Sequence, residues 1–90
     1  MAEFKITNIV NGNTIETKPT WVWKNRDGIE LKGNLIVISG LQLSPNNSKL
    51  LESLLLNQYV TIVNPKQIED RIDVIECNVL LNNVDVVKYF

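Results

Sequence analysis

The sequence predicts a mainly β domain, a small five-stranded Greek-key barrel with one short helix between the third and fourth strands. Several short segments alternate apolar and polar residues, as strands do, and turn-forming residues such as Asn-Gly separate them. One leucine-rich segment instead repeats at helical spacing. The order of three strands, one helix and two strands suits a partly open barrel whose helix covers one end. The 90 residues fit one domain, 1–90.

The first two strands form a long hairpin. Residues 4–10 alternate and stop at the Asn-Gly pair of residues 11–12, which favours a tight turn. Residues 14–24 resume the alternation, and Pro19 within them predicts a kink. The Asn-Arg-Asp-Gly sequence at 25–28 then predicts the second turn.

The third strand and the helix follow. Residues 29–39 become apolar on both faces in their second half, and Gly33 indicates a bulge or barrel corner. After a loop that ends in the helix-capping residue Ser48, leucines at residues 50–55 repeat at helical spacing until Asn57.

Two strands complete the barrel. Residues 58–64 alternate, and Pro65 is expected to end that strand. Residues 74–81 form the last strand, which closes at the Asn-Asn pair of residues 82–83.

Composition excludes several kinds of site. Nine basic and ten acidic residues give a net charge of −1, so strong non-specific binding to nucleic acid is disfavoured. Cys77 is the only cysteine and histidine is absent, which excludes a disulfide within the chain, a Cys/His zinc site and a Ser-His triad. Cys77 is expected to be a small buried apolar residue. No metal or other cofactor is expected.

No membrane span is expected, because every apolar run is far shorter than the roughly 18 residues that a spanning helix needs. The polar first residues resemble no secretory signal, so the expected location is cytoplasmic.

Three segments carry a family resemblance. Residues 10–15, Val-Asn-Gly-Asn-Thr-Ile, are similar to a hydrophobic, Asp-Gly-Asp-Thr, hydrophobic signature. Residues 37–42, followed by Pro45, are similar to Arg-hydrophobic-x-Gly-Ile-Asp. Residues 70–86 resemble, without a gap, the longer run Asp-Arg-Tyr-Gly-Arg-Leu-Val-x-x-Val-Tyr-Leu-x-Gly-x-Asn-Val. Together they resemble the staphylococcal nuclease-like family over residues 4–90. The resemblance implies a barrel of the OB fold.

The resemblance also implies a lost active site. The family hydrolyses phosphodiesters with a calcium ion held by carboxylates, a Glu as proposed general base and two Arg that stabilise the charged transition state. The corresponding positions are uncharged here: the metal-binding Asp positions fall on Asn13 and Gln42, the Arg positions on Val37 and Val74, and the Glu position on Pro45, or on Asn46 if the loop is one residue longer. Catalysis of this kind is therefore not expected.

The pair Trp21 and Trp23 lies on one face of the second strand, with Lys18, Lys24 and Arg26 beside it. Aromatic and basic residues interleaved in this way are typical of a surface on which single-stranded nucleic acid stacks. Alternatively, one or both indoles fill the barrel, or they anchor a protein partner. The sequence does not choose among these three.

The acidic residues Asp70, Asp73 and Glu76 are close in sequence, with Arg71 as a solvated neighbour. Asp73 and Glu76 are three residues apart on a strand and so point to opposite faces, which argues against a shared metal ion.

Three functions remain. The first is a non-catalytic OB-type binding module that acts through a protein partner or self-association. The second is weak binding of single-stranded nucleic acid or a nucleotide through Trp21, Trp23 and the basic residues beside them. The third is a residual or different hydrolase. A fold alone does not decide among them.

Overall fold

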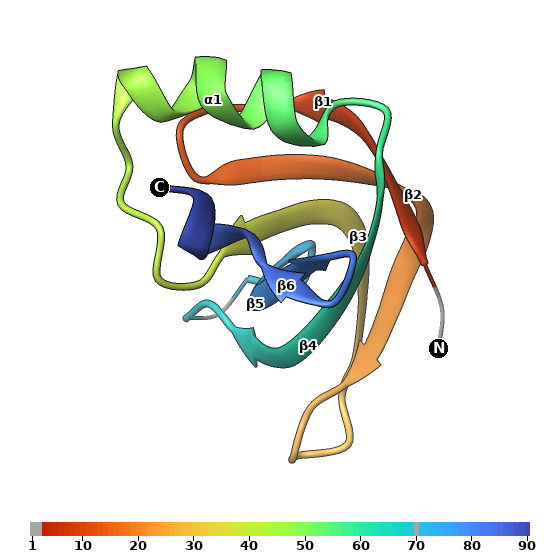
Figure 1. Cartoon of the computed structure of the whole chain (residues 1–90). Helices are drawn as coiled ribbons and strands as arrows, with labels where there is room; N and C mark the ends of the chain where they lie inside the picture. The colour runs from red at the N-terminus through yellow and green to blue at the C-terminus, as the bar shows by residue number, and fades with distance from the viewer. Residues whose placement is uncertain (1–2, 70) are drawn as a thin grey trace.

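A computed structural model describes residues 3–69 and 71–90 of the chain (Figure 1). In chain order the elements of this described part are β1 (Phe4–Ile9), β2 (Thr14–Lys24), β3 (Glu30–Ile38), α1 (Pro45–Leu55), β4 (Tyr59–Gln67), β5 (Val74–Leu81), β6 (Val84–Asp85) and the 3-10 helix η1 (Val86–Tyr89). The order of three strands, a helix and two strands is confirmed. The short β6 and η1 at the end were not predicted.

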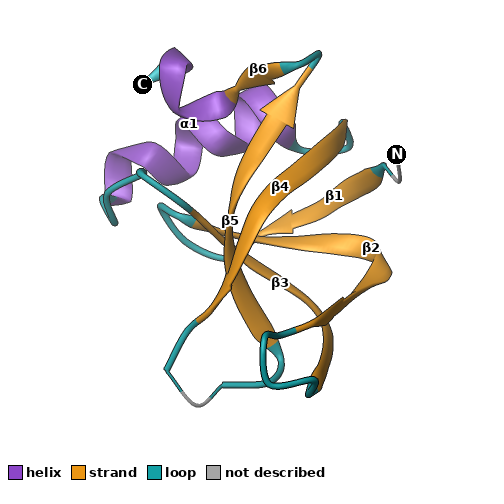
Figure 2. Ribbon diagram, turned by 90° about the horizontal axis from the view of Figure 1, so that it is seen from below, coloured by secondary structure: helices purple, strands orange, loops and turns teal. Residues whose placement is uncertain are grey.

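Five of the strands close into a barrel (Figure 2). Antiparallel pairs join β3 to β2, β2 to β1, β1 to β4 and β4 to β5. A parallel pairing of β3 with β5, from Leu35 opposite Val74 to Ile38 opposite Cys77, closes the ring. The predicted mainly β barrel with one helix is therefore confirmed.

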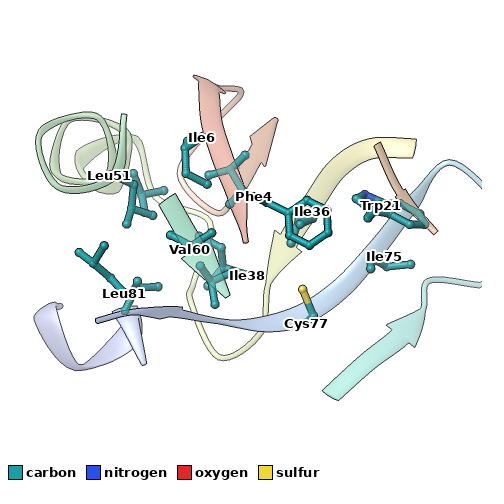
Figure 3. Close-up of a cluster of buried hydrophobic side chains, with 14 of the residues drawn as sticks. Phe4, Ile6, Trp21, Ile36, Ile38, Leu51, Val60, Ile75, Cys77 and Leu81 are labelled. Carbon is teal, nitrogen blue, oxygen red and sulfur yellow. The ribbon is translucent and has the colours of Figure 1, made fainter. Parts of the chain in front are cut away.

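The barrel interior is filled by apolar side chains from each of the strands β1 to β5 and from α1 (Figure 3). Leu51 and Leu55 of the helix are fully buried against the end of the barrel. Cys77 is buried as well, as the sequence predicted. Removal of the thiol from water, and next the negative charge of Glu76, raise the pKa of Cys77 to about 12.

The corner predicted from Pro19 and Gly33 is present. The register between β2 and β3 shifts between Glu16 and Trp21, so the β2 segment around Pro19 carries extra residues and bends away from its neighbour. Gly33 lies opposite Trp21 at this bend. A Cβ atom on Gly33 would be 2.4 Å from the carbonyl oxygen of Asp73, so the close approach of these backbones requires glycine.

Two boundaries differ from the prediction. The helix begins at Pro45 with Ser44 as its N-cap, not after Ser48. Proline is favoured at the first helical position because the backbone N–H that it lacks would have no hydrogen-bond acceptor within the helix there. Strand β4 continues past Pro65 to Gln67. A register shift between Val63 and Lys66 places the proline in a bulge, where a backbone N–H is not needed.

Within residues 3–69 and 71–90, no helix has both the length and the apolar character that crossing a membrane requires.

Candidate ligand-binding groove

The two tryptophans of β2 have different surroundings. Trp21 is 1% exposed, and its indole Nε1 donates a hydrogen bond to the carbonyl oxygen of Leu35 at 3.0 Å. Figure 3 shows its ring beside Ile36 and Ile75 in the interior. Trp21 therefore fills the barrel, which was one of the three interpretations, and leaves too little surface for a base to stack on.

Trp23, two residues further along the same face, is half-buried and packs against the edge of the core. It lines two depressions of about 400 Å³ and about 270 Å³ between β2 and β4. Pro65 lines both as well, so the two depressions adjoin. We call them together the Trp23 groove; its other lining residues are Asn25, Arg26, Asp27, Lys66 and Gln67 in the larger depression and Phe4, Trp21, Val22, Thr61, Ile62 and Ile75 in the smaller one.

A hydrogen bond across the groove holds its outer end. Asn25 Nδ2 donates to Gln67 Oε1 at 2.9 Å and thereby links the β2–β3 hairpin to the end of β4. The side-chain oxygen of Asn25 also accepts from the backbone N–H groups of Asp27 and Ile29, each at 3.0 Å. In Figure 2 the hairpin and the β4–β5 connection lie at the same end of the barrel. One asparagine thus orders the hairpin turn and fixes the width of the groove.

The basic residues predicted beside the tryptophans do not all reach the groove. Arg26 lines it, Lys24 is exposed on the neighbouring strand edge, and Lys18 is exposed beyond the lining residues, opposite Lys5 of β1. Lys66 of β4 lines the groove and was missed, because a lysine after a proline carries no signal of what it will face.

The groove is mildly basic. Its larger depression contains Arg26 and Lys66 against the single carboxylate of Asp27. Among residues 3–69 and 71–90 the one ion pair is Arg71 with Asp73, at 3.4 Å. Neither Arg26 nor Lys66 therefore forms an ion pair with a carboxylate of these residues. A ligand with negative charge is therefore favoured there over a cationic one.

The five positions that the resemblance aligns with the nuclease active site lie outside the Trp23 groove. Asn13 and Val37 are close, because the backbone N–H of Ile38 donates to the carbonyl oxygen of Asn13 at 2.8 Å. Gln42 is exposed in the following loop, Pro45 begins α1 and Val74 is buried at the start of β5. None of these five lines the Trp23 groove.

The acidic residues near β5 do not converge on one point. Asp73 and Arg71 are both well exposed, with side-chain exposures of 64% and 54%, which makes their ion pair energetically weak. Glu76 accepts a hydrogen bond from the Ser39 hydroxyl at 3.3 Å, and Asp70 lies outside the described residues. The described part of the chain contains no group of three Asp, Glu, Cys or His side chains that could hold a metal ion.

The Trp23 groove offers a large apolar ring, amide groups, two cations and the carboxylate of Asp27, and histidine is absent from the sequence. Comparison of the chain with family models, with curated proteins and with solved structures gives no match.

Proposed function

We propose that this chain is a non-catalytic binding module that recognises a protein partner through the Trp23 groove. The observation that carries this proposal is the position of Trp23, half-buried at the junction of two depressions that are rimmed by polar groups. Tryptophan in such a setting is enriched among the residues that contribute most to protein–protein binding, and a few placed polar groups supply orientation.

The strand order supports a barrel of the OB type, and with it the proposed relation to the staphylococcal nuclease-like family. Closure by a parallel β3–β5 pair, with the helix between β3 and β4, is the arrangement expected of that Greek-key barrel. The uncharged residues at Asn13, Val37, Gln42, Pro45 and Val74 support a scaffold that binds without catalysing hydrolysis.

Binding of single-stranded nucleic acid is the second candidate, favoured by Arg26 and Lys66 beside an indole. Two observations weaken it. Because Trp21 is buried, Trp23 is the one indole of β2 on which a base could stack, whereas a stacking surface uses several aromatic rings. The net charge of −1 also means that the protein attracts phosphate groups only weakly. We therefore place a protein partner first.

The test compares two ligands on one tryptophan. Peptides selected from a displayed random library should bind the wild-type protein, and Trp23→Ala should weaken them about thirtyfold, as expected for a residue that dominates an interface. The matched control is Leu50→Ala, an exposed apolar residue of α1, which should leave the affinity unchanged. Thermal melting of each variant establishes that it is folded.

The opposing result is equally specific. If a short thymidine oligonucleotide quenches the tryptophan fluorescence, binds less tightly as salt rises and loses its affinity in Trp23→Ala, the chain is a nucleic-acid binder and the proposal is wrong.

A further inference from the structure

One strand edge beside the Trp23 groove has no neighbour in the described residues. The pairing of β1 with β2 ends at Lys5 opposite Lys18. Strand β2 continues to Lys24, paired only with β3 through the register that ends at Lys24 opposite Glu30. Across residues 3–69 and 71–90, no strand pairs with the other side of β2 at 19–24. Within the described part of the chain, this segment of β2 is therefore an open sheet edge, which can accept another strand.

The backbone of this edge presents hydrogen-bonding groups outward. The N–H of Asn25 donates to the carbonyl oxygen of Ile29 at 3.0 Å, and in an antiparallel pair every second residue bonds to the neighbouring strand. Trp23 and Trp21 therefore direct their backbone groups to β3. The N–H and C=O groups of Val22 and Lys24, between them, point away from β3 toward the open side.

The side chains alternate in the opposite sense. Trp21 and Trp23 are directed to the barrel and the groove, whereas Val22 is 62% exposed and Lys24 is exposed. The backbone of a strand added beside Val22 and Lys24 could therefore form hydrogen bonds with their N–H and C=O groups. Alternate side chains of that strand could enter the Trp23 groove. This combination is the arrangement by which proteins bind extended peptides, with backbone hydrogen bonds for affinity and pockets for alternate side chains.

The opposite wall of the groove is less suited to the same use. Strand β4 also lacks a partner on its β1 side beyond the pair Phe4 and Val60. However, Asn64 has a positive φ of 55°, and Pro65 has no backbone N–H to donate. The bulge there interrupts the regular row of donors and acceptors, so β2 is the better template.

We infer that the open edge of β2 at Val22 and Lys24 binds an extended, acidic segment of a partner protein as an added β-strand, with alternate side chains of that segment in the Trp23 groove. This inference rests on the proposed function and names the chemistry of the partner.

The charges of the edge select an acidic segment and disfavour a second copy of the chain. Lys18 and Lys24 of β2 and Arg26 of the following turn have no acidic residue between them, and the next one along the chain is Asp27. Lys66 of β4 lines the groove together with Arg26, and Glu30 of β3 lies opposite Lys24 on the side away from the open edge. Two β2 edges paired with each other would bring these cations together, which costs free energy. Pro19 removes a further donor, and lysine and proline at an edge are the usual protection against self-pairing. Carboxylates of a partner strand would instead be attracted.

The test locates the hydrogen bonds of the bound peptide. Peptides selected from a random library are resynthesised with N-methyl groups at alternate residues, in the two possible registers. We expect the set that blocks donors facing β2 to lose binding by about tenfold or more, and the other set to keep it, because only one row of peptide N–H groups faces the edge. We also expect the amide hydrogens of Val22 and Lys24 to exchange more slowly in the complex.

Variants of the protein give independent evidence. Val22→Pro removes one outward donor and should weaken binding about tenfold, and Val22→Ala, which shortens the same side chain but keeps that donor, should weaken it clearly less. Lys24→Glu should weaken acidic peptides by a similar factor, and Lys49→Glu on α1, also exposed, is the control of equal charge.

The outcomes separate this inference from the proposed function. Peptides that depend on Trp23 but tolerate both N-methylated sets, or that lack acidic residues, would overturn strand addition and leave the binding module standing. Oligonucleotide binding without any peptide binding would overturn both, and so would a failure to select any peptide.

Discussion

Trp21 and Trp23 show how much of this protein is decided at the scale of one residue. They lie on the same face of β2, two positions apart, with similar sequence neighbours. One is sealed in the core by a hydrogen bond from its indole to Leu35, and the other lines an open groove. Both residues follow the bend around Pro19, and Trp23 differs because it lies two residues nearer the hairpin turn, where it packs only against the edge of the core.

Cys77 supplies a prediction at the same scale. Its thiol is held neutral by burial and by the neighbouring Glu76, which raise its pKa from the ordinary value of 9.0 to about 12. A raised pKa means that above pH 9.0 the unfolded state releases this proton while the folded state keeps it. The contribution of Cys77 to stability is therefore complete below pH 9.0 and lost as pH rises toward 12.

The measurement is urea unfolding as a function of pH. We expect the free energy of unfolding of the wild type to fall by about 1 kcal/mol more than that of Cys77→Ala between neutral pH and about pH 10. The variant carries the same tyrosines and lysines, so it controls for every other group that titrates there. Equal slopes for the two proteins would show that Cys77 is accessible to water.

At the scale of one element, the bend of β2 over β3 determines where the groove lies. The extra residues around Pro19 redirect the strand, and Gly33 permits the close approach of β3 to the backbone of Asp73. The hairpin that carries Trp23 and Arg26 projects from this corner and is linked to β4 by Asn25 and Gln67. The groove thus depends on two irregular segments, the bend of β2 against β3 and the bulge of β4 that carries Pro65 and Lys66.

Gly33→Ala tests this corner. A Cβ atom there would meet the Asp73 carbonyl oxygen at 2.4 Å and the Trp21 ring at 3.2 Å, and the backbone cannot yield cheaply. We expect a loss of about 3 kcal/mol in the free energy of unfolding, measured with urea. Gly28→Ala is the control: it has open space around it and φ of 81°, so it should cost only about 1 kcal/mol of backbone strain. Similar losses for both variants would contradict the steric explanation.

At the scale of the whole molecule, the same barrel offers two places for function. One is the neighbourhood of Asn13 and Val37, which the resemblance to the nuclease family singles out, and the other is the Trp23 groove. The first carries uncharged side chains at the positions that the resemblance singles out, and Glu76, opposite Val37, accepts a hydrogen bond from the Ser39 hydroxyl. The second combines an aromatic ring, two cations with no ion-pair partner among the described residues, and the edge of β2. The proposed binding function is therefore assigned to the second place.

The effect of calcium tests whether the protein is a non-catalytic binding module or a calcium-dependent nuclease. We expect millimolar calcium to leave the melting temperature unchanged, because a ligand stabilises a protein only by binding its folded state, and Asn13 and Gln42 stand where the proposed relation to the nuclease family would place calcium-binding carboxylates. We also expect no cleavage of DNA or RNA by the purified protein, since each lost transition-state contact typically costs about 100-fold to 1,000-fold in rate. A calcium-dependent rise of several degrees, or cleavage proportional to protein concentration, would overturn the non-catalytic proposal.

The sequence by itself determined the order of the five barrel strands and the helix. Alternation with a period of two and leucines at helical spacing follow from which faces are buried, so β5 was predicted with its correct bounds and the helix with its correct place in the order. Pro19 and Gly33 marked the corner because proline and glycine act through their own backbone geometry. These are local properties, and a linear pattern records them.

Tertiary structure alone decided which residues meet. The path of β4 past Pro65 depends on a bulge against β5. The groove brings Trp23 and Arg26 together with Lys66, which lies roughly forty residues away in the sequence. The hydrogen bond between Asn25 and Gln67 likewise joins residues 42 positions apart. Whether an indole of β2 is buried depends on the bend and on the carbonyl of Leu35, contributed by another strand. Contacts between distant segments are set by the closure of the barrel and by packing in three dimensions, which the periodicity of a single segment does not encode.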